Sequence, residues 1–290
     1  MYTGPARPGK PSMHRRNELS ATLPFGFSFD VDRFVAAYAR LGVSAYQFYR
    51  NEERPPSVGD ALAVVARHGA RFDSIHGVFG YHLDPSGPDP AHREHCLRVY
   101  EREGELARQL GGPMVVVHPS AWTPERAELS RAQVEAASAQ RWPRLDDWMR
   151  RLAEIGERLG VVYLMENQPF NCPLGHDAGE LARRVLAVGS AALRVCLDTG
   201  HAHITGDLTR AVTEAAPAIA YVHAHDNDGA VDDHRMPGDG TIDWGSFAAA
   251  LRRCGVSAPR MLEVFYDEAR VERMAAAGLG VRLGAALALG

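Results

Sequence analysis

Short apolar runs alternate with longer amphipathic stretches along nearly the whole chain. Runs of this length predict buried strands, and apolar positions three and four residues apart predict the helices between them. Eight strands are expected, at Leu19–Phe27, Ser44–Tyr49, Arg71–His76, Met114–His118, Val161–Glu166, Leu193–Asp198, Ile219–His225 and Arg260–Phe265. Helices are expected at Asp32–Leu41, Val58–His68, Ala91–Leu110, Leu145–Leu159, Ala178–Val188, Leu208–Ala216 and Trp244–Arg253, with a last one beginning near Asp267.

This alternation predicts an α/β fold, a single-domain (β/α)8 TIM barrel. Several helices are expected to end at a glycine before the next strand, where a left-handed cap would lie; these are Gly42, Gly69, Gly111, Gly160 and Gly255. A doubly wound open sheet is the alternative, but the segment after the first strand, FGFSFD, lacks the glycine-rich phosphate turn of that fold. Residues 1–18 are expected to form a flexible tail, and 19–290 the catalytic barrel.

Composition narrows the class of protein. The 290 residues are 46% hydrophobic and 23% charged, as in ordinary globular proteins. The net charge is -4 and Lys10 is the only lysine, so no basic stripe favours a nucleic-acid partner. Four cysteines without C-x-x-C spacing are expected to be reduced thiols in a cytoplasmic protein. The sequence contains no run of about 18 apolar residues, the length that would predict a membrane span.

In a barrel of this type the chemistry lies at the carboxyl ends of the strands. Six successive strands end on, or run into, imidazole and carboxylate side chains, namely His76, His118, Glu166, Asp198 with His201, His223 with Asp232 and His234, and Glu263. These are ligands that zinc and manganese share. A solvated turn at 223–239, or a hydrogen-bonded core histidine at any single position, is the alternative. Six such ends together favour a divalent metal, because buried carboxylates without a cation cost several kcal/mol.

The segments IHGVF, VVVHPS, MENQPF, CLDTGHAHITGD, VHAHDNDGAVDDHRMPGDGTIDW and LEVF resemble the xylose isomerase-like TIM-barrel superfamily. That superfamily unites sugar isomerases and epimerases with apurinic-site endonucleases. Resemblance to the epimerase branch implies one divalent ion, manganese, zinc, magnesium or cobalt, held by Glu166, Asp198, His223 and Glu263, and no organic cofactor. It also implies that Glu166 and Glu263 move a proton on and off carbon through a metal-stabilised enediolate, while His201 contacts the substrate.

The endonuclease branch carries three zinc ions on nine side chains, and this resemblance adds His76, His118, His201, Asp232 and His234 as ligands. The alternative function is therefore a multinuclear zinc phosphoesterase. PSAW stands where those endonucleases have a further histidine, HAHDN replaces an HLND-type segment, and a basic loop for DNA is lacking. We therefore expect an isomerase or epimerase of carbohydrate metabolism that acts on a small sugar, sugar phosphate or related hydroxy-carbonyl compound.

Residues near the barrel mouth could contact such a substrate. Trp122, Arg235, His225 and Tyr81 are expected to do so, and Arg50 is a second candidate, beside Arg235, for anchoring an anionic group. Phe27, Tyr46, Phe48 and Phe265 could stack on a sugar face or simply fill the upper barrel layer. A sensor without activity is disfavoured, because it has no use for two carboxylates facing a carbon centre. Members of the superfamily often form dimers or tetramers.

Overall fold

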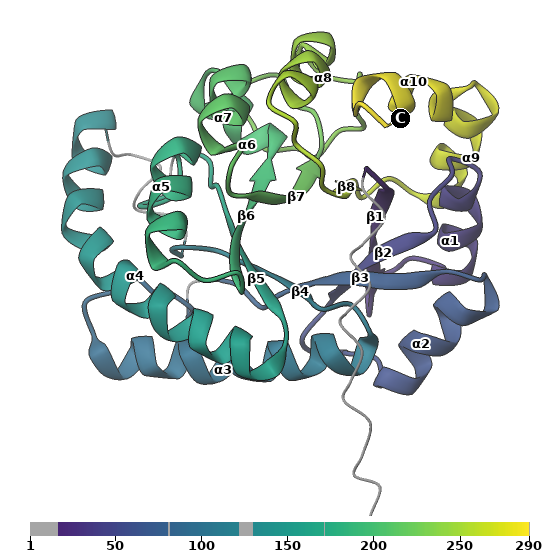
Figure 1. Cartoon of the computed structure of the whole chain (residues 1–290). Helices are drawn as coiled ribbons and strands as arrows, with labels where there is room; N and C mark the ends of the chain where they lie inside the picture. Colours follow the sequence, from purple (N-terminus) through teal and green to yellow (C-terminus); the bar gives the residue numbers. More distant parts are fainter. Residues whose placement is uncertain (1–16, 81, 122–129, 171, 290) are drawn as a thin grey trace, which may run out of the picture.

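The computed structural model describes residues 17–80, 82–121, 130–170 and 172–289. Within this part of the chain, eight parallel strands close into a barrel, each paired with its neighbours in chain order and the last with the first (Figure 1). The strands are β1 (Leu19–Phe25), β2 (Ala45–Arg50), β3 (Arg71–His76), β4 (Met114–Val117), β5 (Val162–Glu166), β6 (Leu193–Asp198), β7 (Ile219–Ala224) and β8 (Arg260–Leu262). The predicted (β/α)8 TIM barrel is confirmed.

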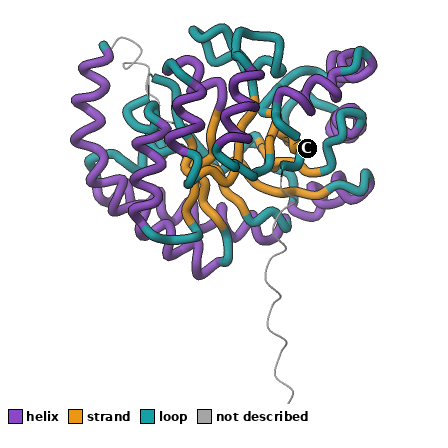
Figure 2. Tube along the Cα trace, turned by 45° about the horizontal axis from the view of Figure 1, so that its top comes forward, coloured by secondary structure: helices purple, strands orange, loops and turns teal. Residues whose placement is uncertain are grey.

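Helices surround the strands on the outside of the barrel (Figure 2). They are α1 (Val31–Ala39), α2 (Val58–Arg67), α3 (Pro90–Leu110), α4 (Arg131–Leu159), α5 (Ala178–Val188), α6 (Thr199–Thr205), α7 (Leu208–Ala215), α8 (Trp244–Arg253), α9 (Glu268–Ala276) and α10 (Leu279–Ala286). None of the helices in the described ranges is long and apolar enough to cross a membrane. The predicted tail lies almost wholly outside the described residues.

Side-chain caps explain where most helices begin. An Asp or Ser before the first turn accepts a hydrogen bond from a free backbone N–H, which satisfies one of the unpaired donors there; the caps are Asp30, Ser57, Asp89, Ser130, Asp177, Asp198, Asp207, Asp243 and Asp267. The glycines predicted at helix ends do adopt positive φ, for example 78° at Gly111 and 69° at Gly160.

Two helices differ from the sequence prediction. The α4 helix begins at Arg131, well before the expected Leu145, because Ser130 and Gln133 form a capping box and the helix continues through Pro143. The short α6 helix directly follows β6 and was not predicted. Its cap is Asp198 itself, so a candidate metal ligand also starts the helix that carries His201.

Alternation along the strands separates two layers of core. One set of side chains packs between the strands and the helices, and it includes Tyr46 and Phe48. The Tyr46 hydroxyl donates to the carbonyl oxygen of Val35 at 3.1 Å, so these two aromatics fill core space instead of facing a substrate. The other set fills the barrel interior with Met114, Val116, Leu164, Cys196, Tyr221 and Met261. The ligand-type residues cluster at the carboxyl end of the strands, beyond this interior layer.

Candidate metal centre and active site

Four residues from four neighbouring strand ends converge on one buried point. Nδ1 of His223 on β7 lies 2.8 Å from Oε1 of Glu166 on β5 and 2.9 Å from Oε2 of Glu263, which follows β8. Oδ2 of Asp198 on β6 lies 3.9 Å from the same nitrogen. One ligand atom from each of the four lies within 4.8 Å of the others, and all four residues are buried. We call Glu166, Asp198, His223 and Glu263 the tetrad.

The tetrad has the chemistry of a cation site. Its three carboxylates are buried, and Oε2 of Glu166 and Oε2 of Glu263 make no hydrogen bond of acceptable geometry with the described residues, although histidine nitrogens lie close to both. Burial raises the pKa of Glu166, but His223 and His118 outweigh it and hold that pKa well below its usual range. Buried carboxylates this close together require positive charge nearby. A divalent ion supplies that charge without the need for protonated histidines.

Three further histidines are oriented as metal ligands would be. Nδ1 of His76 donates to the carbonyl oxygen of Gly77 at 2.8 Å, that of His201 to Asn167 at 2.8 Å, and that of His234 to Glu263 at 3.0 Å. A carbonyl oxygen only accepts, so each Nδ1 carries a proton and each Nε2 can bind a metal when it is unprotonated. Partners of this kind fix the ring and the tautomer in metal sites.

These histidines form two groups on either side of the tetrad. On one side, Nε2 of His118 lies 3.0 Å and Nε2 of His76 3.8 Å from Oε2 of Glu166. Burial and the neighbouring His118 lower the pKa of His76 to about 4, so His76 is a neutral imidazole at physiological pH.

On the other side of the tetrad, two imidazoles lie close to Asp232. Nε2 of His201 lies 3.0 Å and Nε2 of His234 3.5 Å from Oδ2 of Asp232. Burial opposes protonation of His234, but Asp232 and Glu263 outweigh it and raise the pKa of His234 to about 9. All nine residues that the sequence suggested as ligands therefore lie in one contiguous cluster, with the tetrad at its centre.

The comparisons with known proteins match this architecture. The family described as "Xylose isomerase-like TIM barrel" matches residues 35–283. The chain belongs to this family. An uncharacterised protein of Methanocaldococcus jannaschii is 28% identical over 185 residues, which span 62% of this chain and 60% of that relative. A "Probable endonuclease 4" of Thermoplasma acidophilum is 25% identical over 259 residues, 82% of this chain and 85% of the relative.

Solved structures agree on the fold of this xylose isomerase-like barrel. The structure titled as an L-ribulose 3-epimerase superposes with a TM-score of 0.74 at 20% identity, and covers 93% of this chain and 95% of the other. At that identity the likeness establishes the fold, and the chemistry has to be argued from the residues.

Three of the expected substrate contacts lie beside carboxylates in this xylose isomerase-like barrel. His225 is fully buried and its Nε2 lies 3.0 Å from Asp198, so it faces a tetrad carboxylate. Arg235 is held by Asp233 at 2.6 Å and Asp228 at 3.3 Å, and Arg50 makes a two-pronged ion pair with Glu103. Both arginines are therefore ion-paired, and Arg50 also lines the cavity at the barrel mouth. Trp122 and Tyr81 lie outside the described residues.

His201 lies between two protein groups. One of its ring nitrogens donates to the Asn167 carbonyl, and the other lies 3.0 Å from Asp232. The contact of His201 with a substrate stays a prediction. Asn167 was not predicted as a site residue. Its amide oxygen accepts from the Asp198 N–H at 2.7 Å, and its Nδ2 donates to the Asp198 carbonyl at 3.0 Å.

A small aromatic cavity opens beside the metal-type cluster. It has a volume of about 250 Å³, and its lining includes Phe27, Tyr49, His76 and Phe79. Phe27 and Tyr49 stack at a centroid distance of 5.7 Å, and Phe79 lies 4.9 Å from His76. Phe265 packs against Tyr49 and His234. Phe27 and Phe265 therefore do lie at the mouth, together with Tyr49 and Phe79, which the sequence reading missed.

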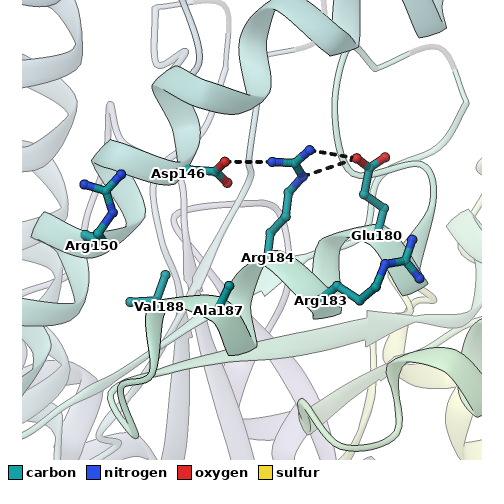
Figure 3. Close-up of a pocket in the computed structure, with 7 residues that line it drawn as sticks. All are labelled: Asp146, Arg150, Glu180, Arg183, Arg184, Ala187 and Val188. Carbon is teal, nitrogen blue, oxygen red and sulfur yellow. Dashed lines mark hydrogen bonds and ion pairs between the residues drawn. The ribbon is translucent and has the colours of Figure 1, made fainter.

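A larger groove lies elsewhere, on the outer surface between α4 and α5 (Figure 3). Its volume is about 450 Å³. Arg184 in this groove pairs with Asp146 at 2.7 Å and Glu180 at 3.0 Å, and its guanidinium lies 4.3 Å over Trp142. The groove contains none of the ligand-type residues, so the smaller cavity at the strand ends is the better candidate active site.

Proposed function

We propose that this protein is a divalent-metal-dependent isomerase or epimerase of a small sugar or related hydroxy-carbonyl compound. The observation that carries the proposal is the pair of buried carboxylates, Glu166 and Glu263, which approach the same nitrogen of His223 from β5 and from the end of β8, on either side of β6 and β7. Each has one oxygen without a hydrogen bond to the described residues. Such a pair can serve two opposed positions around one substrate carbon.

The tetrad residues would hold the metal ion, since three carboxylates and one imidazole suit manganese, magnesium, cobalt or zinc. When bound, such an ion stabilises the negative charge that develops on the oxygens of a hydroxy-carbonyl substrate. Asp198 is held by the N–H of His201 at 2.7 Å and by His225, so its geometry is fixed before substrate arrives. Fixed ligands are what a precise proton-transfer site requires.

Proton transfer would then fall to the two glutamates. One carboxylate removes the proton from the carbon beside the carbonyl, and the electron pair of that C–H bond passes toward the carbonyl oxygen. The other glutamate, which enters the cycle as the carboxylic acid, returns its proton to the opposite face of the same carbon and so inverts that centre. Return to the neighbouring carbon, with the hydroxyl proton moved between the oxygens, gives the isomer instead.

The size and lining of the mouth cavity fit a small substrate. Aromatic rings such as Tyr49 and Phe79 can stack on the apolar face of a sugar, while the tetrad binds its oxygens. The L-ribulose 3-epimerase with the same fold supports a ketose as the substrate class. We also propose the cytoplasmic location expected from the sequence, a compartment in which cysteines stay reduced.

Isotope exchange tests the proposal. Protein loaded with manganese and incubated in D2O with a panel of ketopentoses and ketohexoses should introduce deuterium at the carbon beside the carbonyl of at least one sugar. Glu166→Gln and Glu263→Gln should each lower this exchange by about 10²–10⁴-fold, the usual contribution of a positioned acid or base. Exchange at an undiminished rate in both variants would refute the assigned roles.

Phosphoester hydrolysis is a second candidate, and a specific observation favours it. Asp232 with His201 and His234, and Glu166 with His76 and His118, form further ligand groups beside the tetrad. Two or three zinc ions there would suit phosphate chemistry, and the relative named as a probable endonuclease 4 points the same way. Zinc-loaded protein that cleaves bis-p-nitrophenyl phosphate, with no carbon exchange on any ketose, would establish this alternative.

A further inference from the structure

The orientation of His223 differs from that of the other histidines in the cluster. His76, His201 and His234 each donate Nδ1–H to a backbone carbonyl and direct Nε2 inward, whereas His223 directs Nδ1 to the carboxylates. Its Nε2 faces the side-chain amide of Gln47 on β2, with the two nitrogens 3.1 Å apart. Both residues are completely buried. At His223 the side chain of Gln47 therefore takes the position that a backbone carbonyl has at the three other histidines.

This contact constrains how His223 can bind a cation. An imidazole that binds a metal through Nδ1 carries its proton on Nε2, and that N–H needs an acceptor because an unpaired buried donor costs about 1–3 kcal/mol. Metal-bound histidines generally donate this second N–H to a fixed partner. In this structure the side chain at hydrogen-bond distance from Nε2 is Gln47.

The side-chain amide of Gln47 can supply the acceptor that Nε2–H of His223 needs, because one of its two ends is an oxygen. Nε2 of Gln47 lies near His223 and 3.3 Å from Oγ of Ser74, while the buried Oε1 has no hydrogen-bond partner among the described residues. The two ends have nearly the same size, and only hydrogen bonding distinguishes them. With the amide turned by half a rotation, Oε1 lies where the nitrogen was and can accept from Nε2–H of His223, while the single proton of the Ser74 hydroxyl stays with Oδ1 of Asp73.

A group of hydrogen-bonded polar side chains in the barrel interior, Asp73, Ser74 and Tyr221, lies next to this amide, and we call it the polar floor. Oγ of Ser74 lies 2.8 Å from Oδ1 of Asp73 and 2.9 Å from the hydroxyl of Tyr221, and that hydroxyl also lies 2.9 Å from Oδ1 of Asp73. All three residues are fully buried. A register shift between β2 and β3 leaves Asp73 without a paired residue in β2, and the polar groups of Asp73 and Ser74 both reach Tyr221. The floor connects β2, β3 and β7 beneath the tetrad.

We propose that Gln47 is a positioning residue for the metal centre, in that its amide oxygen accepts from Nε2–H of His223 and so directs the Nδ1 lone pair at the bound cation. The inference rests on the metal-binding part of the proposed function and is independent of the substrate. Removal of such a partner is expected to weaken metal affinity by about 10–100-fold.

Metal binding to three variants tests this role. The dissociation constant for Mn²⁺ is measured by competition with a chromophoric chelator. Gln47→Leu should raise it by about 10–100-fold, and Gln47→Glu, which keeps an acceptor oxygen, should stay much closer to the original protein. Thr22→Val is the matched control, because Thr22 pairs in register with Gln47 and its buried hydroxyl has no partner among the described residues. It should leave the affinity unchanged.

The protonation of His223 gives a readout that a purely structural role would not affect. In zinc-loaded protein with ¹⁵N-labelled histidine, long-range ¹H–¹⁵N spectra should show His223 protonated on Nε2. This measurement uses the original protein, so it decides the question even if Gln47→Leu does not fold. A His223 with an unprotonated Nε2, or a Gln47→Leu protein with unchanged Mn²⁺ affinity, would overturn the inference. Failure of all proteins, including the original one, to bind any divalent ion would instead refute the metal centre itself.

Discussion

Nε2 of His225 lies 3.0 Å from each carboxylate oxygen of Asp198. The His225 ring also stacks on the ring of His234, at a centroid distance of 4.1 Å. His225 therefore links a tetrad carboxylate to the outer group of histidines. We infer that it orients both, a role different from the substrate contact expected from the sequence.

Replacement of His225 tests that role. His225→Phe keeps the stacking on His234 but removes the hydrogen bond to Asp198, so Mn²⁺ affinity should fall by about 10-fold or more. His203→Gln is the control, since His203 lies nearby on α6 and its ring contacts Thr241, away from the tetrad. The chelator competition described above measures both. An unchanged affinity in His225→Phe would show that Asp198 does not need this partner.

Gly200 should be intolerant of any side chain. A Cβ added there would lie 2.0 Å from Cε1 of His225, closer than any real contact, so the ring would have to move. Gly200→Ala should therefore weaken metal binding and lower the melting temperature. Gly284→Ala in α10 is the matched control, because a Cβ there meets nothing within 4 Å and alanine favours the helix by up to about 1 kcal/mol. Equal metal affinity in both variants would contradict this packing.

Asp226 is a structural anchor for the loop that carries Asp232 and His234. Its two oxygens accept hydrogen bonds from the N–H groups of Asn227, Gly238 and Ile242 and from Nε1 of Trp244, at 2.8 to 3.1 Å. Asp226→Asn replaces one acceptor oxygen by a donor, which should cost about 2–3 kcal/mol of unfolding free energy. Thermal denaturation measures this loss. A melting temperature within 1 °C or so of the original would show that the loop is held by other contacts.

Protein stripped of metal should lose stability as the pH rises. The pKa of His234 is about 9 in the folded protein, above the ordinary value of about 6.5, because Asp232 and Glu263 outweigh the effect of burial. A proton held only in the folded state stabilises that state fully below pH 6.5 or so, and this contribution disappears as the pH passes through about 9. Melting temperatures between pH 6.5 and 9.5 should fall less steeply for His234→Gln. Identical slopes would contradict the assignment.

The barrel could be predicted from the sequence because the signals for its strands and helices are local, within a few residues of each element. Leu193–Asp198, Ala178–Val188 and Trp244–Arg253 were expected with the bounds that the structure has. Each depends on apolar spacing, a cap or a glycine within a few residues. The α6 helix was missed because seven residues are too few for a periodic pattern. The early start of α4 was not predicted, and it depends on the capping box of Ser130 and Gln133 and on a helix that continues through Pro143.

The candidate ligands could be predicted for a related reason, since parallel strands bring their carboxyl ends to one rim. What the sequence could not provide was the partner of each side chain. Gln47 and His223 are 176 positions apart and meet only when the barrel closes. Arg235 and Arg50 could be expected at the mouth as free cations, but their carboxylate partners depend on loop geometry and on α3.

Anomalous diffraction from crystals grown with manganese tests the central claim most directly. The account predicts a peak enclosed by Glu166, Asp198, His223 and Glu263, with ligand atoms about 2.0–2.3 Å from the ion and Nδ1 as the coordinating atom of His223. Crystals soaked with saturating manganese and zinc that show no peak among these four residues would contradict it.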